Sequence, residues 1–434
     1  MNSNLIKNDN LVWHPFTVYN QHRIDPIKIV RANNEFLYDE NGNEYIDLVS
    51  SWWTNIHGHC HPKLIEAISN QASQLDHIMF NDFTHQSAVD LSYELLKKTI
   101  QKNGKVLFSD CGSASVEIAM KIAHQYHINN GKEKCKFVAL QGGYHGDTFG
   151  AMALSKSLNF HHHFNNKLIE VDFLPVSYQY IGQNNLHEEL NCLRNIEDYI
   201  DKNKNDISFL IIEPLIQGAS GMRVISEDFC KKLLEICKNN NIITIFDEVM
   251  TGFGRAGKLF ATDFFELKPD IICLSKGLSG GMLPLAATVV RSEISDCFSG
   301  DGKTLIHGHT FTANPILCKL AHASLMLFDE ESTLRKVTNI NNLYHTIFED
   351  FVSKAGDLCI NYRICGTIFA FDLKQEIKFG SEISSIIKKE MMSQKMIIRP
   401  IGSSFYFLPP YCISIDLLKN SIFKSLEIIK KIFN

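Results

Sequence analysis

Short apolar runs alternate with amphipathic segments along most of the chain after about residue 100. Apolar runs rich in β-branched and aromatic residues are typical of strands, and they lie at 105–109, 136–140, 209–214, 241–249 and 270–275. Residues 113–127 and 227–240 instead repeat apolar side chains at helical spacing. Continuous apolar strands that alternate with helices predict a mostly parallel α/β sheet covered on both faces. Residues 283–290 add one further strand, which we expect to be antiparallel.

The pattern changes towards both ends of the chain. Beyond about residue 325, a long helical region (330–355), short apolar runs and a closing helix from about 415 indicate a smaller α+β unit. Residues 35–49 alternate around an Asn-Gly pair, which predicts a β-hairpin. We therefore expect an N-terminal segment (1–55) packed with a small domain (326–434), and a large domain (56–325) between them in the sequence.

Composition excludes several classes of protein. The chain has 434 residues, 45% of them hydrophobic, and a formal net charge of -5, so it lacks the basic character of a nucleic-acid-binding protein. Its twelve cysteines are scattered, with no paired CxxC, which favours reduced thiols in a cytosolic protein. The first residues lack the pattern of a signal peptide, and no apolar run is long enough to span a bilayer. We expect a cytoplasmic protein.

Two stretches are rich in histidine. In SWWTNIHGHCHP (51–62), His57, His59 and His61 alternate and would converge on one face of an extended segment, as zinc ligands do. Gly58 and Pro62 instead indicate a turn into a helix, which would separate the imidazoles, so we predict no metal site. The second stretch, NFHHHFNN (159–166), is expected to be a solvated surface loop.

Side chains at the predicted strand ends are the strongest candidates for chemistry, because ligands of such sheets bind at the carboxyl ends of the strands. Lys276 and Asp247 each end an apolar run, and most lysines and aspartates do not. Gly112 and Ser113 open a helix, where backbone N–H groups suit a phosphate. The alternatives are ordinary helix N-caps, at Ser113 or Ser115 and at Asp247, and an exposed loop aromatic at Tyr144, on the Gly-rich turn after 136–140.

Taken together, these residues match one cofactor. A lysine for a Schiff base, an acid for a pyridinium nitrogen, a helix start for a phosphate and an aromatic ring for stacking are the requirements of pyridoxal phosphate. Val249 lies on the same side of its strand as Asp247.

The motifs FDEVMTGFGRAGKLFA and PDIICLSKGLSGGMLPLAA resemble the class III pyridoxal-phosphate aminotransferases, and the resemblance runs across nearly the whole chain. It implies fold type I and a homodimer whose active sites lie at the subunit interface. Within the family, WHPFT, SWWTNIHGH, GGYHGDTFGAM and LIHGHTFTANP are similar to the members that convert 8-amino-7-oxononanoate to 7,8-diaminononanoate in biotin synthesis. Those members usually take the amino group from S-adenosylmethionine, and some take it from lysine.

The resemblance also implies a role for each matching residue. Lys276 bonds the cofactor and carries a proton, Asp247 pairs with the ring nitrogen, and Tyr144 and Val249 cover the two ring faces. Gly112 and Ser113 hold the phosphate, and Thr310 reaches it from the partner subunit. The implied substrate contacts are an aromatic wall, a carboxylate-binding arginine and weaker pocket positions: Trp52, Trp53, Arg399, Asp147, Arg255, Gly308 and Tyr406.

Two positions depart from the family pattern, and other functions stay open. Phe16 stands where the family usually has Tyr, and His309 stands where it often has Pro. The nearest alternatives are an aminotransferase for ornithine, 4-aminobutyrate or a polyamine, and glutamate-1-semialdehyde aminomutase; the double Trp and WHPFT argue against them. A cofactor-binding protein without catalysis and a metal hydrolase built on the His cluster are the alternatives from other classes.

Overall fold

The computed structural model describes residues 11–19, 24–100, 103–158 and 160–433. Its largest sheet has seven strands in the order β4 (Gly104–Ser109), β12 (Ala286–Arg291), β11 (Ile271–Leu274), β10 (Ile243–Asp247), β7 (Ile207–Ile212), β5 (Lys136–Leu140) and β6 (Asp172–Leu174). β12 is antiparallel to both of its neighbours, and the other pairings are parallel. The mostly parallel sheet and its one antiparallel strand are therefore as predicted.

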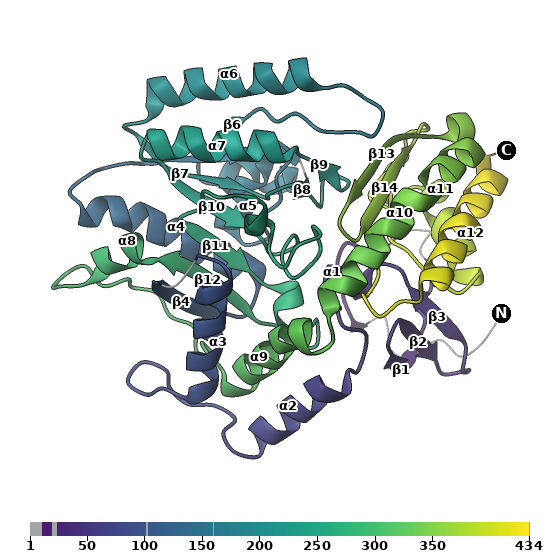
Figure 1. The fold of residues 1–434 in the computed structure, drawn as a ribbon, viewed down its shortest axis with the longest axis horizontal. Helices are drawn as coiled ribbons and strands as arrows, with labels where there is room; N and C mark the ends of the chain where they lie inside the picture. Colours follow the sequence, from purple (N-terminus) through teal and green to yellow (C-terminus); the bar gives the residue numbers. More distant parts are fainter. Residues whose placement is uncertain (1–10, 20–23, 101–102, 159, 434) are drawn as a thin grey trace.

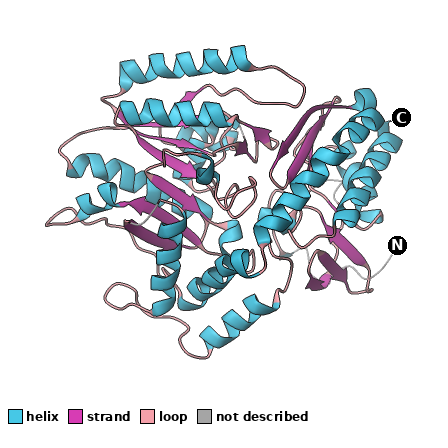
Figure 2. Ribbon diagram, in the orientation of Figure 1, coloured by secondary structure: helices cyan, strands magenta, loops and turns pink. Residues whose placement is uncertain are grey.

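Helices cover both faces of this sheet (Figures 1 and 2), which is why its central strands are apolar throughout. α4 (Gly112–Asn129) buries the predicted face of Val116, Ala119, Met120 and Ala123 against one side. α6 (Leu186–Asn203) and α7 (Glu227–Asn239) contribute buried side chains to a second cluster that also contains residues of β7 and β10. Within the described residues, no helix is both long and apolar enough to cross a membrane.

The rest of the large part is helical, with one short hairpin. α9 (Pro315–Glu330) packs against α2 (Pro62–Ala72) and α3 (Gln86–Lys98). α2 begins at Pro62, next to the predicted start at Lys63. The remaining elements are α5 (Phe149–Leu154), α8 (Ser292–Ser295), the paired β8 (Ile216–Gln217) and β9 (Arg223–Val224), and short 3-10 turns that include η3 (His162–Lys167), η4 (Ala261–Phe264) and η5 (Lys276–Ser279).

The C-terminal part is a three-stranded antiparallel sheet backed by helices. The strands run in the order β13 (Cys359–Cys365), β14 (Ile368–Leu373) and β16 (Ser404–Phe407), and the helices are α10 (Thr333–Ala355), α11 (Glu382–Ser393) and α12 (Ile415–Phe433). The helix predicted at 330–355 begins at Thr333, because Ser332 adopts a left-handed conformation (φ 50°) that separates α9 from α10.

The N-terminal strands lie beside this C-terminal part (Figure 1). β1 (Ile29–Asn33), β2 (Phe36–Asp39) and β3 (Glu44–Asp47) form an antiparallel unit, and β15 (Met396–Ile397) pairs with β3 in parallel. The predicted hairpin is confirmed: Gly42 takes φ 79° in its turn, and Asp39 Oδ1 accepts hydrogen bonds from the N–H groups of Asn41 and Asn43. The exact domain limits stay a prediction.

Candidate active site

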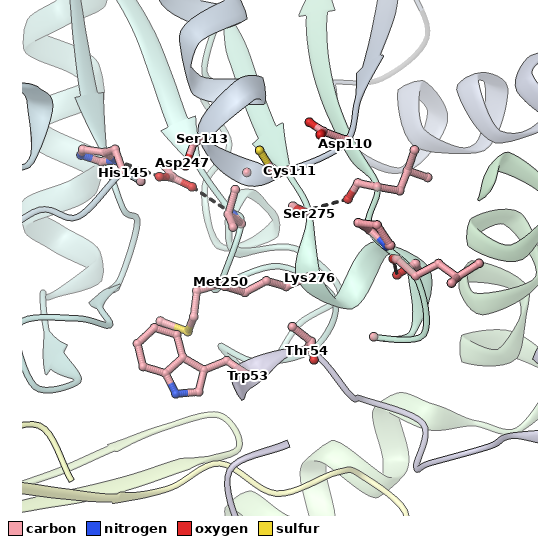
Figure 3. Close-up of a pocket in the computed structure, with 18 of the residues that line it drawn as sticks. Trp53, Thr54, Asp110, Cys111, Ser113, His145, Asp247, Met250, Ser275 and Lys276 are labelled. Atoms are coloured by element: carbon pink, nitrogen blue, oxygen red, sulfur yellow. Dashed lines mark hydrogen bonds and ion pairs between the residues drawn. The ribbon is translucent and has the colours of Figure 1, made fainter. Parts of the chain in front are cut away.

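A cavity of about 480 Å³ opens at the carboxyl ends of the parallel strands (Figure 3). β4, β5, β7, β10 and β11 each deliver residues to it at or just after their last position, as the topology of a parallel sheet dictates. The walls are formed by Trp53, Thr54, Asp110, Cys111, Gly112, Ser113, Tyr144, His145, Gly146, Glu213, Asp247, Val249, Met250, Ser275, Lys276, Ser279, Gly281, Met282, Leu283, Pro284 and Leu285. Seven of the residues predicted from the sequence are among them: Trp53, Gly112, Ser113, Tyr144, Asp247, Val249 and Lys276.

Lys276 lies two residues after the end of β11, at the start of η5, and has φ 47°, a conformation that is uncommon outside glycine. Its Nζ lies 4.9 Å from the centre of the Trp53 ring, and within the described residues it has no ion-pair partner. Burial lowers the pKa of the amine, whereas the charges of Asp247 and Glu213 act in the opposite direction. The result is a desolvated amine at the cavity wall, and such amines act as nucleophiles and bases.

Asp247 is the last residue of β10 and is almost fully buried. Its Oδ2 accepts a hydrogen bond from His145 Nδ1 at 2.7 Å, and its Oδ1 accepts one from the backbone N–H of Val249 (Figure 3). The neighbouring Glu248 points to the opposite side of the strand, where it accepts bonds from the N–H groups of Ala261 and Thr262. Only the first carboxylate of the Asp-Glu pair therefore belongs to the site.

His145 and Glu213 are site residues that the sequence patterns did not single out. His145 Nε2 is buried and has no hydrogen-bond partner among the described residues. Glu213 accepts bonds from the N–H groups of Tyr144 and Gly218, and burial raises its pKa to about 7. The only available signals were their positions, in the Gly-rich turn after β5 and just after the end of β7.

The first turn of α4 forms one wall of the cavity, and the early N–H groups of a helix have no partners within it. A Cβ atom at Gly112 would lie 2.8 Å from Val249 Cγ1, so this close approach requires glycine. Gly146, with φ 128°, likewise leaves space for Ser113 Oγ. Ser113 Oγ in turn accepts a bond from the N–H of Asp147.

This donor set fits pyridoxal phosphate. The cavity joins a desolvated lysine, a buried carboxylate that a histidine holds from behind, and a helix N-terminus that favours a phosphate. Tyr144 and Val249 lie on its walls, where they can cover the faces of a planar ring.

Tyr144 is backed by residues outside the cavity. Its ring lies parallel to that of His161, with 6.3 Å between centroids and 25° between planes, and His161 Nε2 pairs with Asp147 Oδ1 at 2.8 Å. His161 is buried, so the prediction of a wholly solvated loop at 159–166 is wrong at this position; residue 159 lies outside the described residues. Asp147 itself does not line the cavity.

The two tryptophans take different positions in a strained turn, α1 (Ser50–Trp53), in which Ser50, Ser51 and Trp53 have positive φ. Trp53 faces the cavity and donates a hydrogen bond from Nε1 to the Tyr406 hydroxyl at 3.0 Å. Trp52 does not line the cavity. The Arg399 guanidinium stacks on its ring, with Cζ 3.4 Å from the ring centroid. Within the described residues, Arg399 stacks on Trp52 and forms no ion pair with a carboxylate.

Trp52, Arg399 and Tyr406 are not among the residues that line the cavity, and three further predicted residues also lie outside it. Arg255 is fully buried behind the site and donates to the carbonyls of Pro409 and Asn55, so it does not line the cavity. Gly308 and Thr310 are exposed and also lie outside the cavity wall.

The two departures from the family pattern also have defined contacts. Phe16 packs edge-on against Trp52, with 5.9 Å between ring centroids. His309 Nε2 lies 3.5 Å from Asp110 Oδ2, on the rim of the cavity.

The histidines of 57–61 have separate partners. His57 Nε2 bonds to the carbonyl of Ser324, His59 pairs with Asp47, and His61 pairs with Glu331. Asp47 also accepts bonds from the N–H groups of Val49 and Ser51, so His59 supports the turn that presents Trp53. In the part of the chain that the structure describes, no three His, Cys, Asp or Glu residues are grouped to hold a metal ion.

Comparisons with known proteins agree with this geometry. Residues 18–433 match the family model for class III aminotransferases. A protein of Synechococcus elongatus named adenosylmethionine-8-amino-7-oxononanoate aminotransferase is 37% identical over 408 residues, which is 93% of this chain and 94% of that protein. The crystal structure of a protein with the same name from Methanocaldococcus jannaschii has a TM-score of 0.90 and 33% identity over 97% of each chain.

A second solved structure bears on the cofactor. A PLP-bound amine transaminase from an uncultivated Pseudomonas species has a TM-score of 0.88 and 28% identity, over 96% of this chain and 98% of its own. The predicted fold and cofactor are thus confirmed. The chain therefore belongs to the class III aminotransferases and uses pyridoxal phosphate as its cofactor.

Proposed function

We propose that this enzyme transfers an amino group to 8-amino-7-oxononanoate and forms 7,8-diaminononanoate, with S-adenosylmethionine as the donor. The observation that carries the proposal is the single cavity that joins Lys276, Asp247 and the start of α4 beneath Trp53. The Synechococcus and Methanocaldococcus relatives, which carry the name of that reaction, support the choice of substrate.

The reaction consists of two balanced halves. In the first, water supplies the oxygen of the carbonyl that replaces the donor's amine, and the amino group stays on the enzyme. In the second, that amino group replaces the C7 ketone oxygen of the acceptor, which leaves as water. When bound, pyridoxal phosphate supplies the electron sink for the charge that develops at the substrate carbon. No external oxidant or reductant is needed.

The protein's own groups divide the remaining work. Lys276 takes a proton from the substrate carbon and returns it, and its lowered pKa favours the neutral amine that this step requires. His145 fixes the Asp247 carboxylate, which would hold a proton on the ring nitrogen of the bound cofactor. The N–H groups at Gly112 and Ser113 would bind its phosphate. Val249 and Tyr144 would cover its ring.

The outer layer suits a long substrate that carries a carboxylate. Trp53 and Tyr406 form a rigid, hydrogen-bonded aromatic pair, and Trp52 carries the stacked Arg399 guanidinium. A bidentate contact from Arg399 to the substrate carboxylate would fix the far end of the aliphatic chain. Asp147, near the cavity rim, can attract cationic groups of substrate or donor. Arg255 supports the cavity wall from behind through its hydrogen bonds to the carbonyls of Pro409 and Asn55.

We also propose a homodimer in which Gly308 and Thr310 complete the partner's site. Large apolar side chains are exposed in the loop before α3, on α3 itself and in the 305–311 loop: Met79, Phe83, Tyr93, Ile306 and Phe311. His77 and Phe311, with ring centroids 5.1 Å apart, join the two loops. Exposure of this kind is typical of a subunit interface. Mixed dimers of Lys276→Ala and Thr310→Ala chains should regain activity at one of the two sites.

The twelve free cysteines fit a cytoplasmic location, because a reducing compartment keeps thiols unpaired.

The test of function offers 8-amino-7-oxononanoate with S-adenosylmethionine or with lysine and detects 7,8-diaminononanoate by mass spectrometry. Product is expected from S-adenosylmethionine, and none from Lys276→Ala. Turnover of ornithine, 4-aminobutyrate or a polyamine without any 7,8-diaminononanoate would contradict the proposal.

A further inference from the structure

Three consecutive histidines stand at the start of η3: His161 precedes it, His162 and His163 are its first two residues, and of the three only His161 is buried. His162 and His163 are exposed, and their rings contact each other with centroids 3.8 Å apart. The mechanism described above uses none of the three. The difference in burial between identical neighbours indicates that His161 has a specific packing role.

The polar contact of His161 is with Asp147. His161 Nε2 lies 2.8 Å from Asp147 Oδ1, and because a carboxylate only accepts, the imidazole donates. The other ring nitrogen, Nδ1, is buried without a hydrogen-bond partner among the described residues. The Asp147 side chain is 48% exposed, and its backbone N–H bonds to Ser113 Oγ. His161 is therefore what fixes the orientation of a half-exposed carboxylate next to the phosphate-facing turn of α4.

The apolar contact of His161 is with Tyr144. The two rings are stacked with an offset, at 6.3 Å and 25°, and Tyr144 lines the cavity. Burial raises the pKa of the Tyr144 hydroxyl, and Asp147 raises it further through its charge and a side-chain hydrogen bond. One imidazole thus contacts both groups: it backs the Tyr144 ring and holds the carboxylate whose charge raises the pKa of the Tyr144 hydroxyl.

We propose that His161 is a positioning residue that holds the Tyr144 ring at the cavity wall and the Asp147 carboxylate beside it. Without it, both side chains gain rotational freedom, which must be lost again when cofactor and amine bind. The inference depends on the cofactor of the family and on this geometry, whatever the substrate.

The experiment compares three variants with the wild-type protein. His161→Leu removes the donor and the stacking ring, His161→Gln keeps a donor near the place of Nε2, and His162→Leu is the matched control on the exposed neighbour. Cofactor-free protein is titrated with pyridoxal phosphate and followed by absorbance. The loaded protein is then mixed with increasing S-adenosylmethionine, which separates donor affinity from the limiting rate of the first half-reaction. Thermal unfolding of the cofactor-free variants reports folding.

His161→Leu should weaken the binding of both pyridoxal phosphate and the donor by about 3- to 10-fold and change the limiting rate less. His161→Gln should recover most of the loss in donor affinity, and His162→Leu should match the wild type. In an Asp147→Ala background, His161→Leu should have a smaller effect on donor affinity.

Two outcomes would show that the proposal is wrong: His161→Leu binds the cofactor as tightly as the wild type does, or the donor affinity of His161→Gln falls as far as that of His161→Leu. A wild-type protein that does not react with S-adenosylmethionine would count against the proposed donor, and the cofactor titration would still decide the role of His161.

Discussion

Two regions of this molecule concentrate titratable side chains, and only one of them forms a site. Asp247, Glu213, His145 and Lys276 are far apart in the sequence, yet they meet in one cavity because four strands end at the same edge of the sheet. His57, His59 and His61 lie within five residues, yet each has its own partner, from α9, the end of β3 and the residue after α9. The topology of a parallel sheet brings groups together more effectively than closeness in sequence does.

Both regions also bury ionisable groups, with different consequences. Burial raises the pKa of Glu213 to about 7 and lowers that of Lys276, and both side chains face space that a ligand can fill. Burial lowers the pKa of His57 to about 3, but its ring is bonded to Ser324 within the protein. A shifted pKa therefore indicates function only where the group faces a cavity.

The largest effect is expected at Lys276. Lys276→Ala should lower transamination by about 10,000-fold, because it removes both the cofactor-bonding amine and the proton carrier. The matched control is Lys268→Ala, near the opposite end of β11, where the ammonium donates hydrogen bonds to the carbonyls of Thr262 and Phe265. Steady-state assays and borohydride treatment, which should bleach the wild type, measure the difference. Activity above a tenth of the wild-type value in Lys276→Ala would contradict the assignment.

Asp247→Asn should come next, with a loss of about 100- to 1,000-fold in kcat/KM, because an amide holds a proton on the ring nitrogen poorly. Asp270→Asn is a fair comparison: Asp270 is also mostly buried, but it lies just before β11, where it binds Arg291 and the N–H of Thr244. That variant should lose stability and keep its activity. Similar kinetics for the two variants would remove the distinction between the two ends of the sheet.

His57 should affect stability and not chemistry. Its native pKa of about 3 is below the ordinary 6.5, so the unfolded state binds the extra proton and the free energy of unfolding falls as pH drops from 6.5 towards 3. From pH 7 to pH 5 this one group should cost about 2 kcal/mol. Urea unfolding at both pH values should show that the free energy of unfolding of His57→Asn changes by about 2 kcal/mol less than that of the wild type. An unchanged pH dependence would show that the buried imidazole is not responsible.

The smallest effect is expected at His61. Its contact with Glu331 is a single, partly exposed pair, so His61→Gln should change the free energy of unfolding by about 1 kcal/mol or less. Activity should be unchanged, both in this variant and in the wild type treated with a chelator. Loss of activity on chelation would revive the metal hypothesis for residues 57–61.

Much of the fold could be read from local pattern. The run at 136–140 matches β5 residue for residue, and the apolar face of 113–127 is the buried face of α4. Lys276 and Asp247 were identifiable because a charged residue that ends an apolar strand is unusual. His145 and Glu213 were not, since neither carries a pattern that distinguishes a cavity wall from any other loop. The same holds for His161, which has the same residue type as its two exposed neighbours.

The sequence by itself determined the strands, the helices and the chemical types of the principal site residues, because these follow from hydrophobic period and from residues that are costly to bury. Only the tertiary structure decided which side chains share a cavity. It placed Trp53 at the cavity wall and Trp52 beneath Arg399, placed Arg255 behind the site, and dispersed the histidines that looked like a metal centre. Such outcomes depend on how distant strands end and pack, and a local pattern carries no record of that.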